Sequence, residues 1–183
     1  IATNDERTAN KYLSDFSQLM RSVLENSEQD FIPLTKEIEL LELYTKLEHF
    51  RFQDKFNYTI EVNKTIDVEG FKIPPMLLQP YIENAVWHGL RYKTEKGQLN
   101  ITIQPKAKDE ITITITDNGI GRKRSKSLKT EHQKKQNSKG MNNIKKRVAI
   151  LNDMYKDRVD VAIANFTTTD DVGTKVVVTL KKD

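Results

Sequence analysis

Cysteine is absent from this chain of 183 residues, which excludes disulfide bonds and thiolate metal sites and fits a reducing compartment. Long apolar runs are absent too, because no stretch approaches the roughly 20 residues that span a membrane. The opening residues IATNDERTANK contain no apolar signal-peptide core and do not begin with Met. We therefore expect a soluble globular piece of a longer protein.

Charge is unevenly distributed along the chain. The net charge is +4, but residues 122–139 hold eight Lys and Arg against a single Glu, which leaves the remainder at −3. The basicity therefore belongs to one segment, which is either a solvated loop or a loop that meets phosphate. Nucleic-acid binding through it would show a steep salt dependence. The segment lacks the interleaved aromatic residues of a stacking surface, so we expect no nucleic-acid partner.

Apolar residues at helical spacing predict two helices at the start of the chain. The first covers about residues 8–26, and the second runs from about 34 to 52, with Pro33 at a typical helix entry. Their apolar positions are Leu13, Phe16, Met20, Val23 and Leu24 in the first, and Leu34, Ile38, Leu41, Tyr44 and Leu47 in the second. The short link between them predicts an antiparallel helical hairpin.

From Lys55 onward, short alternating segments are separated by helical ones. Alternation predicts strands at residues 56–62, 98–104, 110–116, 160–166 and 174–182, with a short extended piece at 70–75. Helical spacing predicts helices at 76–89, with Gly89 as a candidate C-cap, and at 140–155. This order predicts an α+β fold, a sandwich of a mixed sheet with helices on one face, preceded by the helical hairpin.

The strand at 110–116, in which isoleucine alternates with threonine, ends in the turn DNGIG. Gly119 and Gly121 permit positive φ and a close approach of the backbone to a ligand. Asp117 would then be a fixed carboxylate that accepts a hydrogen bond from an exocyclic amine, such as that of adenine. The alternative is a tight loop in which Asp117 is only a turn residue.

Polar residues also interrupt the apolar helix predicted at 76–89. Asn84 and His88 are four residues apart and share a face of this helix. An Asn carbonyl oxygen suits Mg²⁺, which takes few protein ligands besides phosphates and waters; the simpler alternative is an exposed helix side. Gly140 opens the next predicted helix, where free N–H groups favour phosphate and Lys139 adds a positive charge.

The common nucleotide-binding loops are missing, because the chain has no Walker A sequence and Gly119-Ile120-Gly121 lacks the third glycine of a dinucleotide fingerprint. However, LLQPYIENAVWHG, DNGIG and KGMNNIKKRV occur in this order and spacing. Together they resemble the N box and the two glycine boxes of the GHKL ATP-binding domain, which has the Bergerat fold. The upstream segment LMRSVL…IPLTKEIELLELYTKLEHFRF is similar to that of sensor histidine kinases of the LytS/YehU type.

The resemblance implies a role for each residue that matches the nucleotide-binding motifs. Asn84 is the implied Mg²⁺ ligand, and Asp117 is the implied acceptor of the adenine amine. Gly119 and Gly121 would shape the wall of the nucleotide site. Thr174, in VGTKVVV, would line the adenine pocket.

On the phosphate side, the resemblance implies that His88 approaches phosphate and that Gly140 begins the helix after the ATP lid. The lid departs from the family pattern, because Ser138 stands where a Gly is expected. Trp87 occupies a position where such kinases often carry Lys. Both departures concern catalytic strength rather than the nucleotide site. Pro80 stands where hydrolysing members of the superfamily place a base, so efficient ATP hydrolysis is not expected.

The phosphoacceptor histidine of the family lies in a PHFLFN run, which this chain lacks. His49 belongs to a different block, at the end of the second predicted helix, and His132 lies in the basic segment. We therefore expect a chain that begins just after the acceptor helix and contains no phosphoacceptor of its own.

The resemblance implies that residues 1–52 are the rear part of the dimerisation and phosphoacceptor region and that residues 53–183 are the catalytic ATP-binding domain. The expected function is to bind Mg·ATP and transfer its γ-phosphate to a histidine outside this chain, with a response regulator as the next partner. The full-length protein is expected to be a membrane-anchored homodimer with this domain in the cytoplasm. The alternative is a degenerate nucleotide-binding scaffold without kinase activity.

Overall fold

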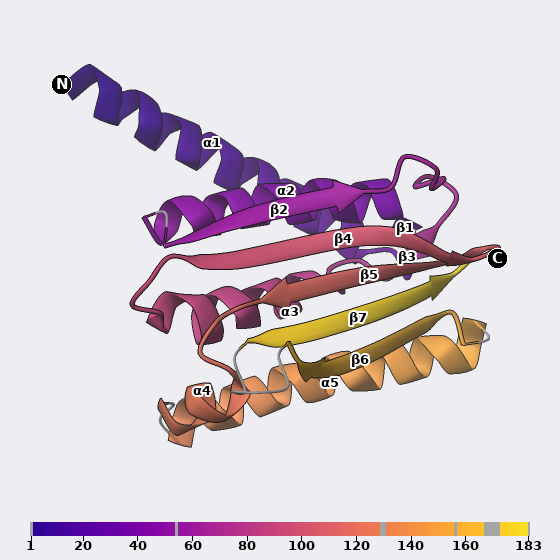
Figure 1. Ribbon diagram of the computed structural model, residues 1–183. Coiled ribbons are helices and arrows are strands. Elements are labelled where there is room, and N and C mark those ends of the chain that lie inside the picture. Colours follow the sequence, from indigo (N-terminus) through magenta and orange to yellow (C-terminus); the bar gives the residue numbers. More distant parts are fainter. Residues whose placement is uncertain (1, 54, 129–130, 156, 167–172, 183) are drawn as a thin grey trace.

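The alternating segments of the sequence form one mixed sheet of five strands in the order β2-β4-β5-β7-β6 (Figure 1). The computed structural model describes residues 2–53, 55–128, 131–155, 157–166 and 173–182, with the backbone alone for 2–4 and 131–138. The strands are β2 Phe56–Val62, β4 Gly97–Ala107, β5 Glu110–Asp117, β6 Val159–Asn165 and β7 Thr174–Lys181. β2 and β4 pair in parallel and the other neighbours pair antiparallel, so the predicted mixed sheet is confirmed.

One face of the sheet is buried because isoleucine and valine alternate with polar residues along its central strands. In β5, Ile111, Ile113 and Ile115 are each at most 2% exposed, and the threonines between them are half-buried on the opposite face. Ile115 pairs with Ile101 of β4 on one side and with Val176 of β7 on the other. Burial of each such side chain contributes about 1.5–3 kcal/mol. This burial fixes the register, because a shift by one residue would turn the isoleucines outward.

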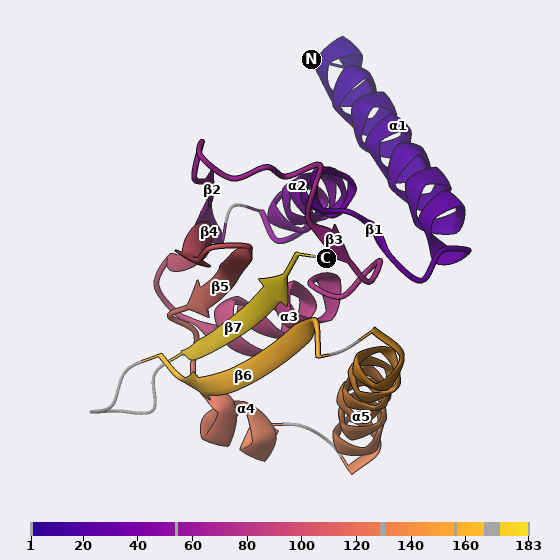
Figure 2. The ribbon, with the colours of Figure 1, turned by 90° about the vertical axis from the view of Figure 1, so that its right-hand side faces the viewer.

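Helices cover the buried face of the sheet (Figures 1 and 2). They are α2 Leu34–Arg51, α3 Gln79–Asn84, α4 Arg122–Leu128 and α5 Glu131–Tyr155. α3 continues directly into a π-helical turn, η1 Ala85–Gly89, and then into a 3₁₀ turn, η2 Leu90–Tyr92. Figure 2 shows α2, α3 and α5 on the same side of the sheet, which confirms the predicted α+β sandwich.

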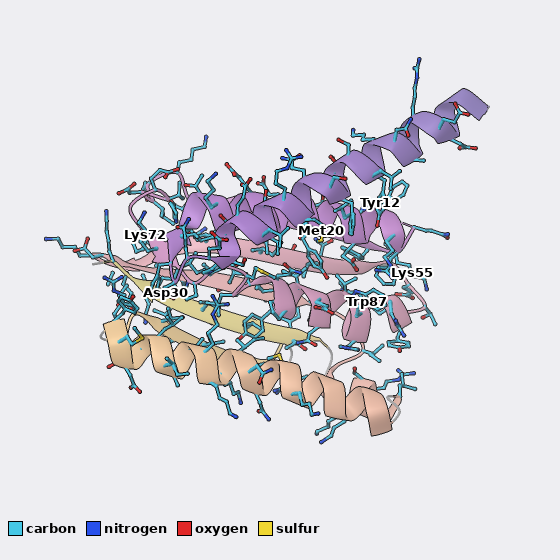
Figure 3. All side chains as sticks on the ribbon, turned by 180° about the vertical axis from the view of Figure 1, so that it is seen from behind. Tyr12, Met20, Asp30, Lys55, Lys72 and Trp87 are labelled. Atoms are coloured by element: carbon cyan, nitrogen blue, oxygen red, sulfur yellow. The ribbon has the colours of Figure 1, made fainter. Side chains whose placement is uncertain are left out.

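The N-terminal helices form the predicted antiparallel hairpin. α1 spans Ala2–Ser27, and its Asp15 forms an ion pair with Lys46 of α2 at 2.6 Å. The ring of Tyr12 lies over the far end of α2, 5.2 Å from that of Phe50 between centroids (Figure 3). Within the described ranges, no helix combines the length and apolar character that membrane crossing requires.

The link between α1 and α2 is tied to the segment before α3. There, β1 Ile32–Pro33 pairs antiparallel with β3 Lys72–Ile73. The predicted helix start at Met76 is wrong, because α3 begins at Gln79 and Met76 adopts a φ of +59°. The predicted C-cap at Gly89 is wrong as well, because the helical turns continue through Tyr92.

Two predictions about the basic segment are also wrong. Residues 122–128 form α4 and not a loop, since Arg and Lys have good helix propensity. α5 begins at Glu131, so Gly140 lies inside this helix and does not open it. An interior glycine costs a helix roughly 0.5–1 kcal/mol. The packing of Leu151, Met141, Ile144 and Val148 against the core offsets that cost.

Candidate functional site

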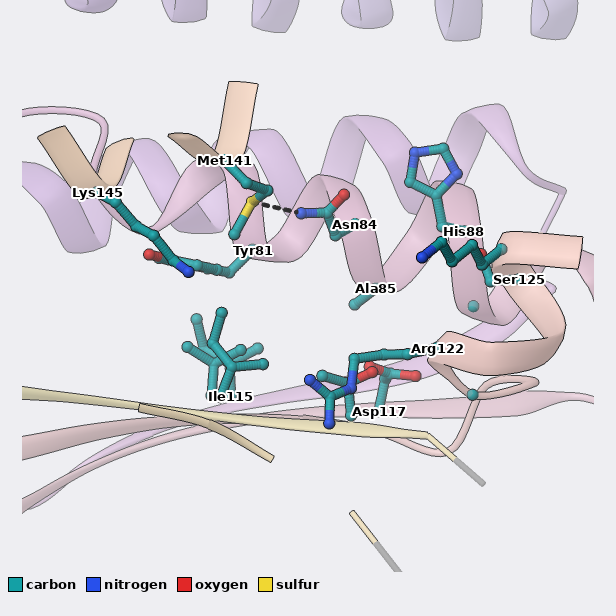
Figure 4. Close-up of a pocket in the computed structure, with 16 residues that line it drawn as sticks. Tyr81, Asn84, Ala85, His88, Ile115, Asp117, Arg122, Ser125, Met141 and Lys145 are labelled. Atoms are coloured by element: carbon teal, nitrogen blue, oxygen red, sulfur yellow. Dashed lines mark hydrogen bonds between the residues drawn. The ribbon is translucent and has the colours of Figure 1, made fainter. Parts of the chain in front are cut away.

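A cavity of about 380 Å³ lies next to the end of β5 and the start of β7 (Figure 4). Its other walls are the α3–η1 segment and helices α4 and α5. Five of the predicted site residues line it: Asn84, His88, Asp117, Gly121 and Thr174. Asp117 comes from the sheet and Asn84 from the helix above it. The two side chains therefore face one cavity, as a shared ligand requires.

Asp117 is the last residue of β5 and is only 3% exposed. Its Oδ1 accepts the N–H of Gly119 at 2.9 Å, and the backbone of Thr174, its partner in β7, also donates to it. Burial raises the pKa of this carboxyl from 3.8 to about 7, although the two backbone hydrogen bonds and the charge of Lys93 act in the opposite direction. A ligand that donates a hydrogen bond to Asp117 would stabilise its ionised form.

The turn after Asp117 requires glycine at two positions for different reasons. A Cβ on Gly119 would lie 2.5 Å from the backbone of Gly89, so the turn approaches η1 closely only because this position has no side chain. Gly121 has a φ of +80°, which other residues rarely adopt. The Oδ1 of Asn118 accepts the N–H of Gln98 at 2.7 Å and fixes the turn to β4. Gly119 thus supports Asp117 from behind and does not itself line the cavity.

Asn84 and His88 reach the cavity from one turn of the α3–η1 segment. The amide nitrogen of Asn84 donates to Sδ of Met141 in α5 at 3.1 Å. This contact orients the amide, and its oxygen lies on the side of His88 (Figure 4). The imidazole of His88 points away from Asp117 (Figure 4). Asn84 therefore offers a hard oxygen at a distance from the carboxylate.

Three cationic side chains that were not predicted also line the cavity: Arg122 and Lys126 of α4 and Lys145 of α5. Arg122 is held by hydrogen bonds from Nη2 and Nε to Oδ1 of Asn165 at 2.7 and 3.2 Å. Residues 122, 125 and 126 share one helical face at the i, i+3 and i+4 spacing, which would have identified them had the segment been predicted as a helix.

Ser125 lies between these cations and is almost completely buried. Among the described residues, nothing forms a hydrogen bond with its Oγ. A buried hydroxyl without a partner is unfavourable, and this one lines the cavity. With one buried carboxylate and several cations, the cavity suits a ligand that carries both a hydrogen-bond donor and negative charge.

Other predicted residues lie outside the cavity. Lys139 and Gly140 are exposed on α5 and do not line it. The side chains of Ser138 and His132 lie outside the described residues. His49 packs its ring against the rings of Phe56 and Tyr58 in β2, with centroids 5.3 and 5.2 Å away.

Trp87 also points away from the cavity, toward the end of α2. Its ring lies 5.0 Å from that of Phe52 between centroids and 4.4 Å beneath the guanidinium of Arg51. Trp87 therefore has a packing role here. The positive charge that a Lys at this position would supply is available in the cavity from α4 and α5.

A metal ion in this cavity would have few protein ligands. Within the part of the chain that the structure describes, no three His, Cys, Asp or Glu side chains gather closely enough to hold one. Mg²⁺ does not need such a cage, because it keeps several waters and binds through one or two protein oxygens together with ligand phosphates. The residues present therefore fit a Mg²⁺ ion that arrives with a phosphate-bearing ligand and is held by Asn84.

Comparisons with known proteins point in the same direction. Residues 74–183 match the family profile described as "Histidine kinase-, DNA gyrase B-, and HSP90-like ATPase". Residues 1–56 match the profile described as "Histidine kinase". The sensor protein LytS of Oceanobacillus iheyensis is 38% identical over 118 residues, which are 64% of this chain and 20% of that protein. The matched part of the chain thus spans about a fifth of the length of the LytS proteins that it resembles.

Solved structures show the same fold at low sequence identity. The histidine kinase domain of the blue-light activated histidine kinase from Erythrobacter litoralis EL346 has a TM-score of 0.56 at 12% identity, covering 96% of this chain and 81% of that one. Full-length ShkA, solved in complex with AMPPNP, has a TM-score of 0.57 at 15% identity, covering 100% of this chain and 40% of that one.

Proposed function

Because the chain belongs to the histidine kinase-, DNA gyrase B- and HSP90-like ATPase family, we propose that it is the ATP-binding part of a two-component sensor histidine kinase. Residues 53–183 would be the catalytic domain, and residues 1–52 the rear part of the dimerisation and phosphoacceptor region. The observation that carries the proposal is that Asp117 and Asn84 line one cavity together with three cations.

Different residues of this cavity would contact different parts of ATP. Asp117 accepts a hydrogen bond from the adenine amine, with Thr174 beside it and with Gly119 and Gly121 shaping the turn. A purine amine is the donor that a buried carboxylate needs. The AMPPNP complex of the structurally similar ShkA supports a nucleotide as the ligand.

The phosphate groups would be contacted by other residues. Arg122, Lys126 and Lys145, which line the cavity, would neutralise phosphate charge, His88 would approach a phosphate group, and Lys139 and Gly140 would approach from α5. Mg²⁺, held by Asn84, would neutralise phosphate charge further and orient the phosphates.

Phosphoryl transfer needs positioning and charge neutralisation more than covalent participation by the protein. The γ-phosphoryl group would leave ATP for an imidazole nitrogen of a histidine outside this chain, and ADP would remain in the cavity. The phosphohistidine would then pass the group to a response regulator. The chain alone is expected to bind nucleotide without phosphorylating itself.

The full-length protein would be a membrane-anchored homodimer with this domain in the cytoplasm. Likeness to a protein described as sensor protein LytS supports a sensor role for the longer protein. An apolar stripe on α1 supports a dimer as well, because these residues are exposed in the single chain: Leu13, Phe16, Met20 and Leu24. Such a stripe on a long helix would be covered by a second copy.

A non-catalytic scaffold is the alternative that the Trp87 and Ser138 departures suggested. The packing of Trp87 against α2 accounts for one of them without loss of the cavity.

Thermal unfolding with and without Mg·ATP tests the proposal. A genuine site raises the melting temperature as ligand exceeds its dissociation constant, whereas no shift in wild type, or an equal shift in Asp117→Asn, would contradict it.

A further inference from the structure

Glu37, in the first turn of α2, is 2% exposed, and its carboxylate is turned into the protein. Its Oε2 accepts the N–H of Met76 at 2.9 Å, and its Oε1 accepts the N–H of Leu78 at 3.0 Å. Both partners lie in the segment that leads into α3, far from Glu37 in sequence. This carboxylate therefore joins the helical N-terminal region to the start of the helix that carries Asn84.

The segment it holds contains a strained turn. Met76 adopts a φ of +59°, in the left-handed region that a residue with a side chain rarely occupies. From the other side, Nη1 of Arg147 in α5 donates to the carbonyl oxygen of Pro75 at 2.9 Å. Burial raises the pKa of Glu37, while the backbone hydrogen bonds and the charge of Arg147 lower it. The turn is thus fixed from α2 and from α5 at once.

α2 also contacts the same helical segment near its other end. Phe52, directly after α2, packs edge-on against Trp87 of η1, and Arg51 lies over the same ring. Asn84 lies between the Met76 turn and Trp87. The position of Asn84 is therefore bracketed by two contacts that both come from α2.

We propose that Glu37 is a positioning residue for the nucleotide site, because it holds the Met76 turn and thereby sets where α3 places Asn84 in the cavity. α3 begins at Gln79, directly after Leu78, so a displacement of the turn moves the helix. α2 lies within residues 1–56, which match the histidine kinase profile, so this contact physically links the helical region to the nucleotide site. The expected effect of Glu37 on nucleotide affinity rests on the proposed function, but its expected effect on the position of α3 does not.

Glu37→Gln tests the proposal, with Glu42→Gln as a matched control on the exposed side of the same helix. The Gln amide keeps the shape of the side chain but turns an N–H donor toward one of the two backbone N–H groups. Hydrogen exchange of the amides at 76–89 should accelerate about tenfold or more over the control, while β4 and β5 keep their protection. The emission of Trp87, the only tryptophan of the chain, should change as well.

Nucleotide binding provides an independent readout. In Glu37→Gln, the affinity for Mg·ATP should fall about tenfold, whereas the affinity for ADP in EDTA should fall much less, because Asp117 is untouched and Asn84 has no metal to hold. This difference would not arise from a general loss of stability. If the wild-type chain binds neither nucleotide, the proposed function fails, and the exchange measurement alone decides the role of Glu37.

Met76→Gly supplies the rescue. Glycine adopts the turn without strain, so Glu37→Gln combined with Met76→Gly should regain part of the lost protection. Should Glu37→Gln not fold, Arg147→Ala is compared in the same way and should accelerate exchange at 76–89. Any of three outcomes would overturn the proposal. The first is equal exchange in the Glu37 and Glu42 variants, and the second is a uniform loss of protection that includes β4 and β5 and is not rescued by Met76→Gly. The third is unchanged exchange at 76–89 in Arg147→Ala.

Discussion

Asp117→Asn should make the chain more stable at alkaline pH while it abolishes nucleotide binding. In the folded chain the pKa of the Asp117 carboxyl is about 7, against an ordinary 3.8. Between these values the unfolded chain has released the proton and the folded chain retains it. The free energy of unfolding therefore falls by about 1.4 kcal/mol per pH unit in this window. The stabilising contribution is fully present below pH 3.8 and is lost above pH 7.

Asn cannot ionise, so the variant lacks this pH dependence, and its amide oxygen can still accept the N–H of Gly119. Relative to wild type, the free energy of unfolding of the variant should rise by roughly 2.5 kcal/mol between pH 5 and pH 8. For a chain of this size that corresponds to about 5–10 °C in melting temperature. Urea denaturation of both chains at pH 5, 6.5 and 8 measures the difference. The other buried carboxyls, Glu37 and Glu48, are present in both chains and cancel.

The result is informative because the two effects have opposite directions. At pH 8 the variant should be the more stable chain and yet show no shift in melting temperature with Mg·ATP, so its loss of binding cannot be attributed to unfolding. A stability difference that stays constant from pH 5 to pH 8 would refute the raised pKa of the buried carboxyl. A preserved Mg·ATP shift would refute its role in binding.

Three further variants test the rest of the cavity. Asn84→Ala should lower the affinity for ATP about tenfold in Mg²⁺ but not in EDTA, as calorimetry would show. Ser125→Ala should raise the free energy of unfolding by about 1 kcal/mol, because a buried hydroxyl without a partner is removed; urea denaturation measures this. The same variant should weaken ATP binding, which calorimetry measures. The double variant Lys126→Ala, Lys145→Ala should weaken ATP binding far more than adenosine binding and should reduce the salt dependence of ATP binding. Equal losses of affinity for the two ligands would count against contact between these lysines and phosphate.

The sheet was predictable because its signal is local. The Ile–Thr alternation of β5 states which face is buried, and DNGIG states where the strand turns. Asp117 was predictable for the same reason, since it ends this alternating strand. Thr174 was named only through the resemblance to the GHKL domain. Asn84 could be predicted as a site residue because it is a polar residue in an otherwise apolar helix.

The errors have different causes, and in one of them tertiary packing overrides a local preference. Gly140 resembles a helix boundary, yet α5 passes through it because its apolar side packs along the core. The basic run at 122–128 was predicted as a loop on charge alone, which concealed Arg122, Ser125 and Lys126 as lining residues. Glu37 was not predicted, because a Glu in a helix usually faces solvent and its two backbone partners are about 40 residues away in sequence.

A crystal structure of the chain with an ATP analogue and Mn²⁺, an anomalous scatterer that substitutes for Mg²⁺, tests the central claim most directly. The account predicts the purine amine within hydrogen-bond distance of Asp117 and the metal peak on the amide oxygen of Asn84. A nucleotide bound elsewhere, or with its base remote from Asp117, would contradict it.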